Sequence, residues 1–242
     1  MTTKEETNTY RTTARVVGVI YLMGFVVGIG GMGLYQSILG APNHLSTLSV
    51  NSMLLAFAAI LWLLSGVGDA AHGVLMFPIL KPHSERIAVG YLAFRIMDAV
   101  FIAIMVLFVL LQIPLGSEYL KAAAPDASSL QALSTVFAQA QLYAYDLSFI
   151  TLGISGLMLC YTLYRATLVP RWLAVWGLLG YAIIFCGMVS AVMGSGLGDL
   201  SSYAGGLWEV VVGVWLIVKG FNASAFVSQA PRTSSLAAPL AP

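Results

Sequence analysis

Charge is what this sequence has least of. Only 9% of its 242 residues are Asp, Glu, Lys or Arg, and 59% are hydrophobic. A soluble domain usually carries about 25% charged residues. So little charge excludes an ordinary water-soluble domain and favours a membrane protein whose side chains mostly contact the lipid bilayer. The formal net charge of +1 offers no electrostatic attraction for nucleic acid, so we expect no nucleic-acid partner.

Cysteine and histidine are also scarce. The two cysteines, Cys160 and Cys186, lie in apolar runs without a Cys-x-x-Cys motif, which favours reduced packing residues over a disulfide or metal site. The three histidines, His44, His72 and His83, do not share a helix face. A catalytic zinc site needs about three protein ligands. We therefore expect no metal site and no cofactor.

Six apolar runs account for most of the chain, at residues 16–38, 50–77, 87–113, 137–164, 172–193 and 203–218. We predict that each forms a membrane-spanning helix, because a helix rises about 1.5 Å per residue across a hydrocarbon core of roughly 30 Å. Pro78 and Pro114 are expected to end the second and third spans. The predicted fold is an all-α, polytopic integral membrane protein with six transmembrane helices.

The two ends of the chain differ from these runs. Residues 1–15 are polar and form a predicted N-terminal tail, and residues 16–221 form the predicted transmembrane domain. Residues 222–242 are rich in Ala, Ser and Pro with almost no charge, which predicts a disordered tail. Inside the domain, residues 114–135 are the longest expected connector. Leucines at helical spacing within it favour a short amphipathic turn on the membrane surface.

Basic residues alternate between the two sides of the predicted membrane domain. The N-terminal tail has three, the second connector has Lys81 and Arg86, and the fourth has Arg165 and Arg171. The first and fifth connectors have none, and the third has only Lys121. Because cytoplasmic loops carry an excess of Lys and Arg, this alternation predicts both termini in the cytoplasm.

The first span is rich in glycine. Gly24 and Gly28 form a small-x-x-x-small pair, the pattern that lets transmembrane helices approach closely. Assembly of the chain into a homo-oligomer through this helix is therefore one hypothesis. A nucleotide-binding interpretation of the glycines is weak, because no strand precedes them.

Ionisable residues interrupt the second and third spans in a regular way. Ser65, Asp69 and His72 have i, i+4, i+7 spacing and therefore share one helix face. The third span repeats this spacing with the residues Tyr91, Arg95 and Asp98. A short connector joins the two spans, so they are expected to pack antiparallel and to place Asp69 and Arg95 at the same depth.

Two further carboxyls lie in later spans. Glu209 is expected at nearly the depth of Arg95, and Asp146 nearer the outer face. Ionisable groups inside membrane helices are costly and by default mark either a functional site or a structural ion pair. We therefore take these eight residues as the candidate site: Arg95, Asp98, Glu209, Asp69, His72, Tyr91, Ser65 and Asp146.

Two interpretations of this polar group remain open. In the structural one, Arg95 pairs with Asp98 on its own helix and with Asp69 or Glu209 on a neighbour, which fixes helix packing. In the functional one, the carboxyls outnumber the single arginine, so some must be protonated, hydrated or occupied by a cation. Excess carboxyls beside a histidine are what a proton relay or cation-coupled carrier needs.

An enzymatic interpretation has less support. Ser65, Asp69 and His72 match a catalytic triad by composition, but the aspartate lies between the other two. In a triad the histidine must bridge the nucleophile and the carboxylate. An intramembrane enzyme acting on a lipid remains an alternative, although we lean against an enzyme.

Four segments together resemble a bacterial membrane family catalogued as domain of unknown function 4386. They are Ala-Arg-Val-Val-Gly-Val-Ile-Tyr-Leu at 14–22, Ala-Phe-Arg-Ile-Met-Asp-Ala at 93–99, Leu-Val-Pro-Arg-Trp-Leu at 168–173, and Glu209 followed by Trp-Leu-Ile-Val-Lys-Gly at 215–220. The resemblance covers about residues 11–221. It implies a six-helix membrane fold and an emphasis on Arg95 and Glu209, but no established activity.

This chain departs from the family at one position of that pattern. The family usually has a glutamate where this chain has Asp98, whose side chain is shorter. The departure favours Glu209 over Asp98 as the partner of Arg95. The leading functional hypothesis is a non-enzymatic membrane protein: a carrier of a small molecule or ion, or a binding or accessory subunit. The alternatives are the lipid enzyme and a purely structural subunit that assembles with itself.

Overall fold

The computed structural model describes residues 4–41, 44–222 and 225. Six α-helices account for nearly all of them: α1 (Lys4–Leu39), α2 (His44–Leu80), α3 (Glu85–Tyr119), α4 (Ala124–Arg165), α5 (Arg171–Val192) and α6 (Gly198–Val218). Each contains a stretch long and apolar enough to cross a membrane. The prediction of an all-α protein with six spans is therefore confirmed, and the chain is a multi-span membrane protein.

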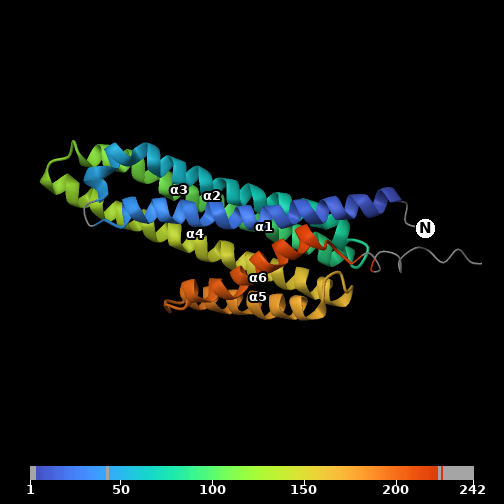
Figure 1. The fold of residues 1–242 in the computed structure, drawn as a ribbon. Helices are drawn as coiled ribbons and strands as arrows, with labels where there is room; N and C mark the ends of the chain where they lie inside the picture. The colour runs from blue at the N-terminus through green and yellow to red at the C-terminus, as the bar shows by residue number, and fades with distance from the viewer. Residues whose placement is uncertain (1–3, 42–43, 223–224, 226–242) are drawn as a thin grey trace, which may run out of the picture.

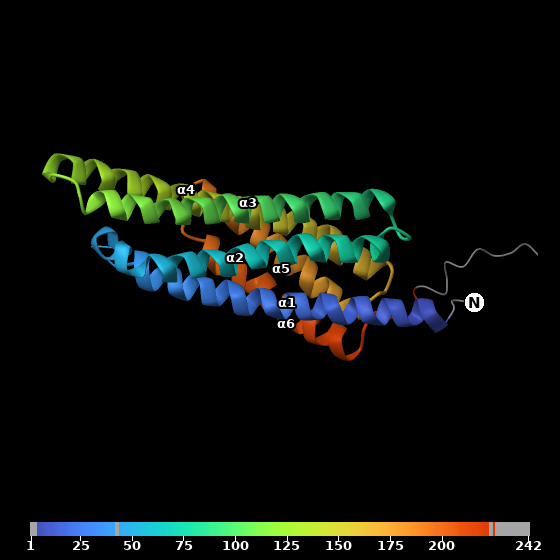
Figure 2. The same ribbon diagram turned by 90° about the horizontal axis from the view of Figure 1, so that it is seen from above.

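The helices form a closed ring. Each packs against the next in the chain, and α6 packs back against α1 (Figures 1 and 2). The start of α1 and the end of α6 lie at the same end of the bundle (Figure 1). At the opposite end α1–α4 project beyond α5 and α6, which have only 22 and 21 residues. The ring is therefore complete over only part of its length.

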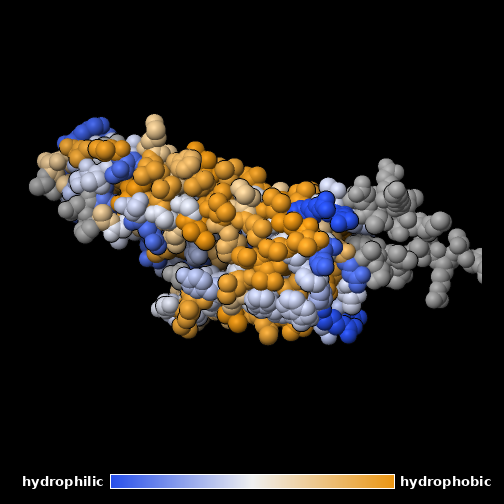
Figure 3. All heavy atoms as spheres, viewed as in Figure 1, coloured by the Kyte–Doolittle hydropathy of each residue, from blue (hydrophilic) through white to orange (hydrophobic). Residues whose placement is uncertain are grey.

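The outer surface of the bundle is apolar. Orange, hydrophobic residues cover most of the face in Figure 3, and blue, hydrophilic residues gather towards its two ends. Large apolar side chains such as Val26, Met53 and Leu179 are 65%, 84% and 61% exposed. In water such a surface would be unstable, so these side chains contact the hydrocarbon of the bilayer.

The buried apolar side chains form two cores. The six-helix core takes residues from all six helices, among them Val17, Met76, Leu159, Leu173 and Trp208. The four-helix core takes residues from α1–α4 alone: Ile38, Leu45, Leu48, Leu55, Ala59, Trp62, Met105, Val106, Val109, Leu115 and Ala144. The second core lies where α1–α4 project past the α5–α6 hairpin.

Uncharged polar contacts hold the helices around the four-helix core together. The Ser134 hydroxyl donates to Gln112 Oε1 at 2.8 Å, and Gln112 Nε2 donates to the Ser134 carbonyl at 3.0 Å. His44 Nε2 lies 3.0 Å from the same hydroxyl. Tyr35 donates to Gln141 at 3.1 Å. These contacts, which we call the neutral network, link α1 to α4 and link α4 to α2 and α3.

Two expected helix ends are wrong. Pro78 and Pro114 lie inside α2 and α3, which continue to Leu80 and Tyr119. A proline removes one backbone hydrogen bond, and membrane helices tolerate this where neighbouring helices hold the chain in place. At this end α3 is so close to α2 that a Cβ on Gly116 would lie 2.6 Å from Leu48 Cβ.

The expected long connector between the third and fourth spans is also wrong. Only residues 120–123 separate α3 from α4, which is a continuous helix of 42 residues. Pro125 lies in the first turn of α4, where the missing N–H donor would have no helical partner. At the other end of the chain, α1 begins at Lys4, ahead of the apolar run. Nearly all of the predicted disordered tail, 222–242, lies outside the described residues.

Candidate functional site

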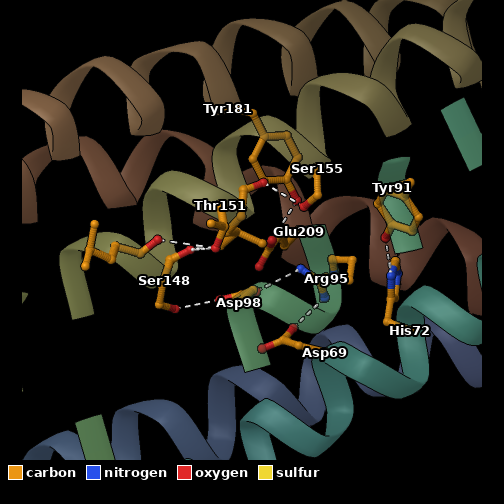
Figure 4. A network of polar contacts seen from close by, with 12 residues as sticks. Asp69, His72, Tyr91, Arg95, Asp98, Ser148, Thr151, Ser155, Tyr181 and Glu209 are labelled. Atoms are coloured by element: carbon orange, nitrogen blue, oxygen red, sulfur yellow. Dashed lines mark hydrogen bonds and ion pairs between the residues drawn. The ribbon is translucent and has the colours of Figure 1, made fainter. Parts of the chain in front are cut away.

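The α2–α3 hairpin brings the predicted polar residues together. Arg95 forms an ion pair with Asp69 across the two helices, and its Nη1 lies 3.6 Å from Asp98 Oδ2 on its own helix (Figure 4). Ser84 caps the start of α3 by accepting a hydrogen bond from Ile87 N. A tight connector and two matching i, i+4, i+7 faces produce this register, as the sequence predicts.

The same register pairs His72 with Tyr91. The Tyr91 hydroxyl makes a hydrogen bond with His72 Nδ1, and both side chains are buried. The edge of the Tyr21 ring packs on the imidazole, with the ring centroids 4.6 Å apart. His72 Nε2 has no hydrogen-bond partner among the described residues. Because Asp69 binds Arg95 and His72 binds Tyr91, the contacts found do not connect Ser65, Asp69 and His72 as a triad.

The structure adds two partners that sequence reasoning missed. The Ser148 hydroxyl on α4 donates to Asp98 Oδ1 at 2.5 Å. The Tyr181 hydroxyl on α5 donates to Glu209 Oε1 at 2.6 Å (Figure 4). A lone serine or tyrosine in an apolar span gives no signal of its own, since such residues usually have ordinary packing roles.

The expectation that Glu209 is the partner of Arg95 is wrong. The ion pairs of Arg95 are with Asp69 and Asp98, and the buried guanidinium is 4% exposed. Glu209 lies on α6, and its carboxyl is instead hydrogen-bonded by the neighbouring α5. The shorter side chain of Asp98 leaves its pairing with Arg95 loose, and Asp69 provides the close contact.

A cavity of about 390 Å³ reaches this polar group. Five of the eight predicted residues line it: Ser65, Asp69, Arg95, Asp98 and Glu209. His72 and Tyr91 are not among its lining residues; His72 instead lines a small void of about 10 Å³. Asp146 is half-buried on α4 and is likewise not part of the lining. The cavity lies between the two cores, because its walls include Trp62 and Met105 from one and Tyr21 and Ile184 from the other.

Carboxyl groups outnumber basic groups in this cavity. Three carboxyls, Asp69, Asp98 and Glu209, share it with one guanidinium. Asp98 is 1% exposed, yet its Oδ2 has no hydrogen-bond partner in the described part of the chain, and neither does Arg95 Nε. Buried polar atoms are normally satisfied, and these two unpaired atoms are enclosed beside the cavity rather than exposed to it.

Both helices of the α1–α6 seam line the cavity, and we infer that it opens there. At one end of this seam the helices touch, since a Cβ on Gly18 would lie 2.5 Å from the Gly213 carbonyl oxygen. Farther along α1 they diverge, and a Cβ on Gly24 or Gly28 would have nothing within 4 Å. Both glycines line the cavity, and assembly of the chain with a second copy through this helix stays a prediction.

Exposed apolar side chains form the rim of this opening. Ile29 on α1 and Tyr203 and Leu207 on α6 line the cavity and are 68%, 67% and 61% exposed. Their exposed surfaces point to the hydrocarbon layer.

Among the described residues no group of three or more His, Cys, Asp or Glu side chains is placed to hold a metal ion.

Comparison with known proteins gives one match. No curated protein and no solved structure matches the chain. A family model, described as "Domain of unknown function (DUF4386)", matches residues 16–220. Since this match covers most of the sequence and all six spans, the chain belongs to the DUF4386 family of multi-span membrane proteins.

Proposed function

We propose that this protein is a non-enzymatic carrier or binding protein that holds a small molecule or ion in the cavity beside Arg95. The observation that carries the proposal is the cavity itself. Its volume of about 390 Å³ lies within the roughly 300–1,000 Å³ of small-molecule pockets, and it reaches a charged group that would otherwise be buried. A purely structural ion cluster has no need of such a space.

The proposal includes the orientation of the chain. The basic connectors, the start of α1 and the end of α6 lie on one side of the bundle (Figure 1). The excess of Lys and Arg on this side favours its placement in the cytoplasm of a bacterial cell. The cavity lining from α6 comes from Ser202 to Glu209, the half of the helix farther from that side. We therefore expect the cavity to open towards the outside of the plasma membrane.

A lipid-directed enzyme is the second candidate, and the opening between α1 and α6 favours it. A lipid could reach the cavity by this route without leaving the bilayer. The candidate general base argues against it, because His72 is packed behind the cavity wall against Tyr21 and Tyr91. A base must lie within hydrogen-bond reach of the substrate.

Cysteine labelling tests whether water reaches the cavity. Cys160 and Cys186 are replaced by alanine, and a single cysteine is placed at Ser65 or Ile102, both of which line the cavity. Intact cells are then treated with a small membrane-impermeant thiol reagent. We expect labelling at both positions, because a thiolate in water reacts readily.

Three controls make the result decisive. Leu120→Cys in the α3–α4 connector should react in intact cells, and Ser84→Cys in the α2–α3 connector only in inverted vesicles. Ala58→Cys, which is fully buried, should not react. Unlabelled cavity positions beside correctly labelled controls would overturn the proposal and leave a structural subunit. Labelling of the cavity only in inverted vesicles would contradict the outward opening.

A further inference from the structure

We infer that the ligand of this cavity is an organic cation that carries an apolar group. The inference rests on the proposed function, because it names the class of molecule that the cavity holds. It combines three separate features of the lining: an excess of carboxyls, a concentration of aromatic rings and an apolar opening to the lipid.

The excess of carboxyls favours a positive ligand. Arg95 is almost fully buried, and both Asp69 and Asp98 already pair with its single positive charge. Glu209 lines the same cavity and accepts a hydrogen bond from the Tyr181 hydroxyl. An anionic ligand would meet three carboxyls and one occupied guanidinium, whereas a cation would restore electrical balance near Glu209.

Aromatic side chains supply the second feature. Six of them line the cavity: Tyr21, Phe25, Trp62, Tyr145, Phe149 and Tyr203. The face of an aromatic ring attracts a cation, and quaternary ammonium groups in particular are recognised in this way. Rings and carboxyls in one cavity thus favour an amine or quaternary ammonium over a small hydrated metal ion, which would prefer oxygen ligands alone.

The opening supplies the third feature. Ile29, Tyr203 and Leu207 form its rim, and each is more than 60% exposed to the hydrocarbon layer. A fully polar molecule would lose its hydration at this rim without compensation. A molecule with an apolar part can lie in the seam between α1 and α6 while its charged group reaches Glu209.

Three matched probes test the inference. They are 4-hydroxyphenyltrimethylammonium, its neutral isostere 4-tert-butylphenol, and the anion 4-hydroxybenzenesulfonate. The first two differ only in a charged nitrogen or a carbon at one position. Binding to the full chain in lipid nanodiscs is measured by titration calorimetry, with empty nanodiscs subtracted for partition into lipid. We expect the cation to bind at least about tenfold more tightly than the neutral probe, and the anion not to bind.

Each other outcome overturns the inference in a distinguishable way. Equal binding of the cation and the neutral probe would show an apolar cavity without charge selectivity. Preferential binding of the anion would make Arg95 the recognition group. No binding of any probe, with the cavity cysteines still labelled, would remove this ligand class and leave the proposed function intact. No binding of any probe together with unlabelled cavity cysteines would overturn both this inference and the proposed function.

A charge-removing variant assigns the selectivity to the cavity. Glu209→Gln keeps the shape of the side chain, so we expect it to lower affinity for the cation by about tenfold while leaving the neutral probe unaffected. Glu118→Gln removes a carboxylate from an exposed pair with Lys121 and serves as the matched control. Unchanged cation binding in Glu209→Gln would contradict the inference. If that variant does not fold, the ranking of the three probes on the unmodified chain still decides.

Discussion

The charged group beside Arg95 and the neutral network around the four-helix core are both polar and both lie among apolar helices, but they differ in how they are satisfied. In the neutral network Gln112 accepts a hydrogen bond from the Ser134 hydroxyl and donates one to the Ser134 carbonyl, and neither residue lines the cavity. In the charged group Asp98 Oδ2 and Arg95 Nε lack hydrogen-bond partners among the described residues and are buried beside a cavity. Polar groups that satisfy each other's hydrogen bonds indicate a structural role. Charged groups with unsatisfied hydrogen bonds beside a cavity indicate a ligand.

Removing Arg95 is expected to have the largest effect on stability. Arg95→Ala leaves the buried Asp69 and Asp98 without a counter-charge, and breaking a buried pair in this way costs about 3–5 kcal/mol. Thermal unfolding in mild detergent measures the loss. The double variant Arg95→Ala, Asp69→Asn should recover part of it, because one orphaned charge is gone. If Arg95→Ala were as stable as the unmodified chain, the charged group would not differ from the neutral network in the way described.

Two glycines of α1 test the seam between α1 and α6. Gly18→Ala forces a methyl group against the Gly213 carbonyl and Ile217, an overpacking that costs about 1–3 kcal/mol. Gly24→Ala meets open space and should change stability little. The same unfolding measurement compares the pair. Equal effects would mean that the two helices do not diverge as described.

The neutral network is expected to matter less for stability and not at all for the ligand. Gln112→Ala removes two interhelical hydrogen bonds. In membranes such bonds contribute about 0.6 kcal/mol on average and at most about 1.7 kcal/mol. Stability should fall within that range in thermal unfolding, while binding of the ammonium probe stays the same. A loss of probe binding at normal stability would extend the site into the four-helix core.

The smallest effect is expected at the exposed pair of Lys121 and Glu118. Both side chains are more than 60% exposed, and solvent screens the attraction between them. Glu118→Gln should shift the free energy of unfolding by less than about 0.5 kcal/mol. A larger loss of stability in thermal unfolding would show that charge pairs stabilise this end of the bundle as they do its centre.

Much of this architecture follows from local sequence signals. Apolar runs predict all six spans, and the i, i+4, i+7 faces of α2 and α3 predict that Asp69 and Arg95 lie at the same depth. They give no prediction of the contact between His72 and Tyr91. The helix ends at Pro78 and Pro114 are wrong, because packing against neighbouring helices outweighs a local helix breaker. Sequence position alone therefore predicts the register of the two helices in a hairpin, but not how far each helix extends.

The cavity and its other partners lie beyond such signals. Ser148 and Tyr181 reach Asp98 and Glu209 from helices α4 and α5, whose placement depends on the whole ring. The divergence of α1 from α6 past Gly18 depends on the angle between helices that are far apart in the chain. No periodicity within one span encodes that angle. The ligand-binding role of the eight candidate residues remains a prediction.

The pairing of neighbouring helices has a consequence for how the chain enters the membrane during synthesis. Asp69 finds Arg95 within the α2–α3 hairpin, and Glu209 finds Tyr181 within the α5–α6 hairpin. A lone charged residue at the centre of a helix opposes insertion by about 2.5–3.5 kcal/mol. Each costly side chain can therefore be released into the bilayer together with its partner, two helices at a time. Only when α6 closes against α1, as the last span leaves the translocon, do Asp69, Arg95 and Glu209 share one cavity.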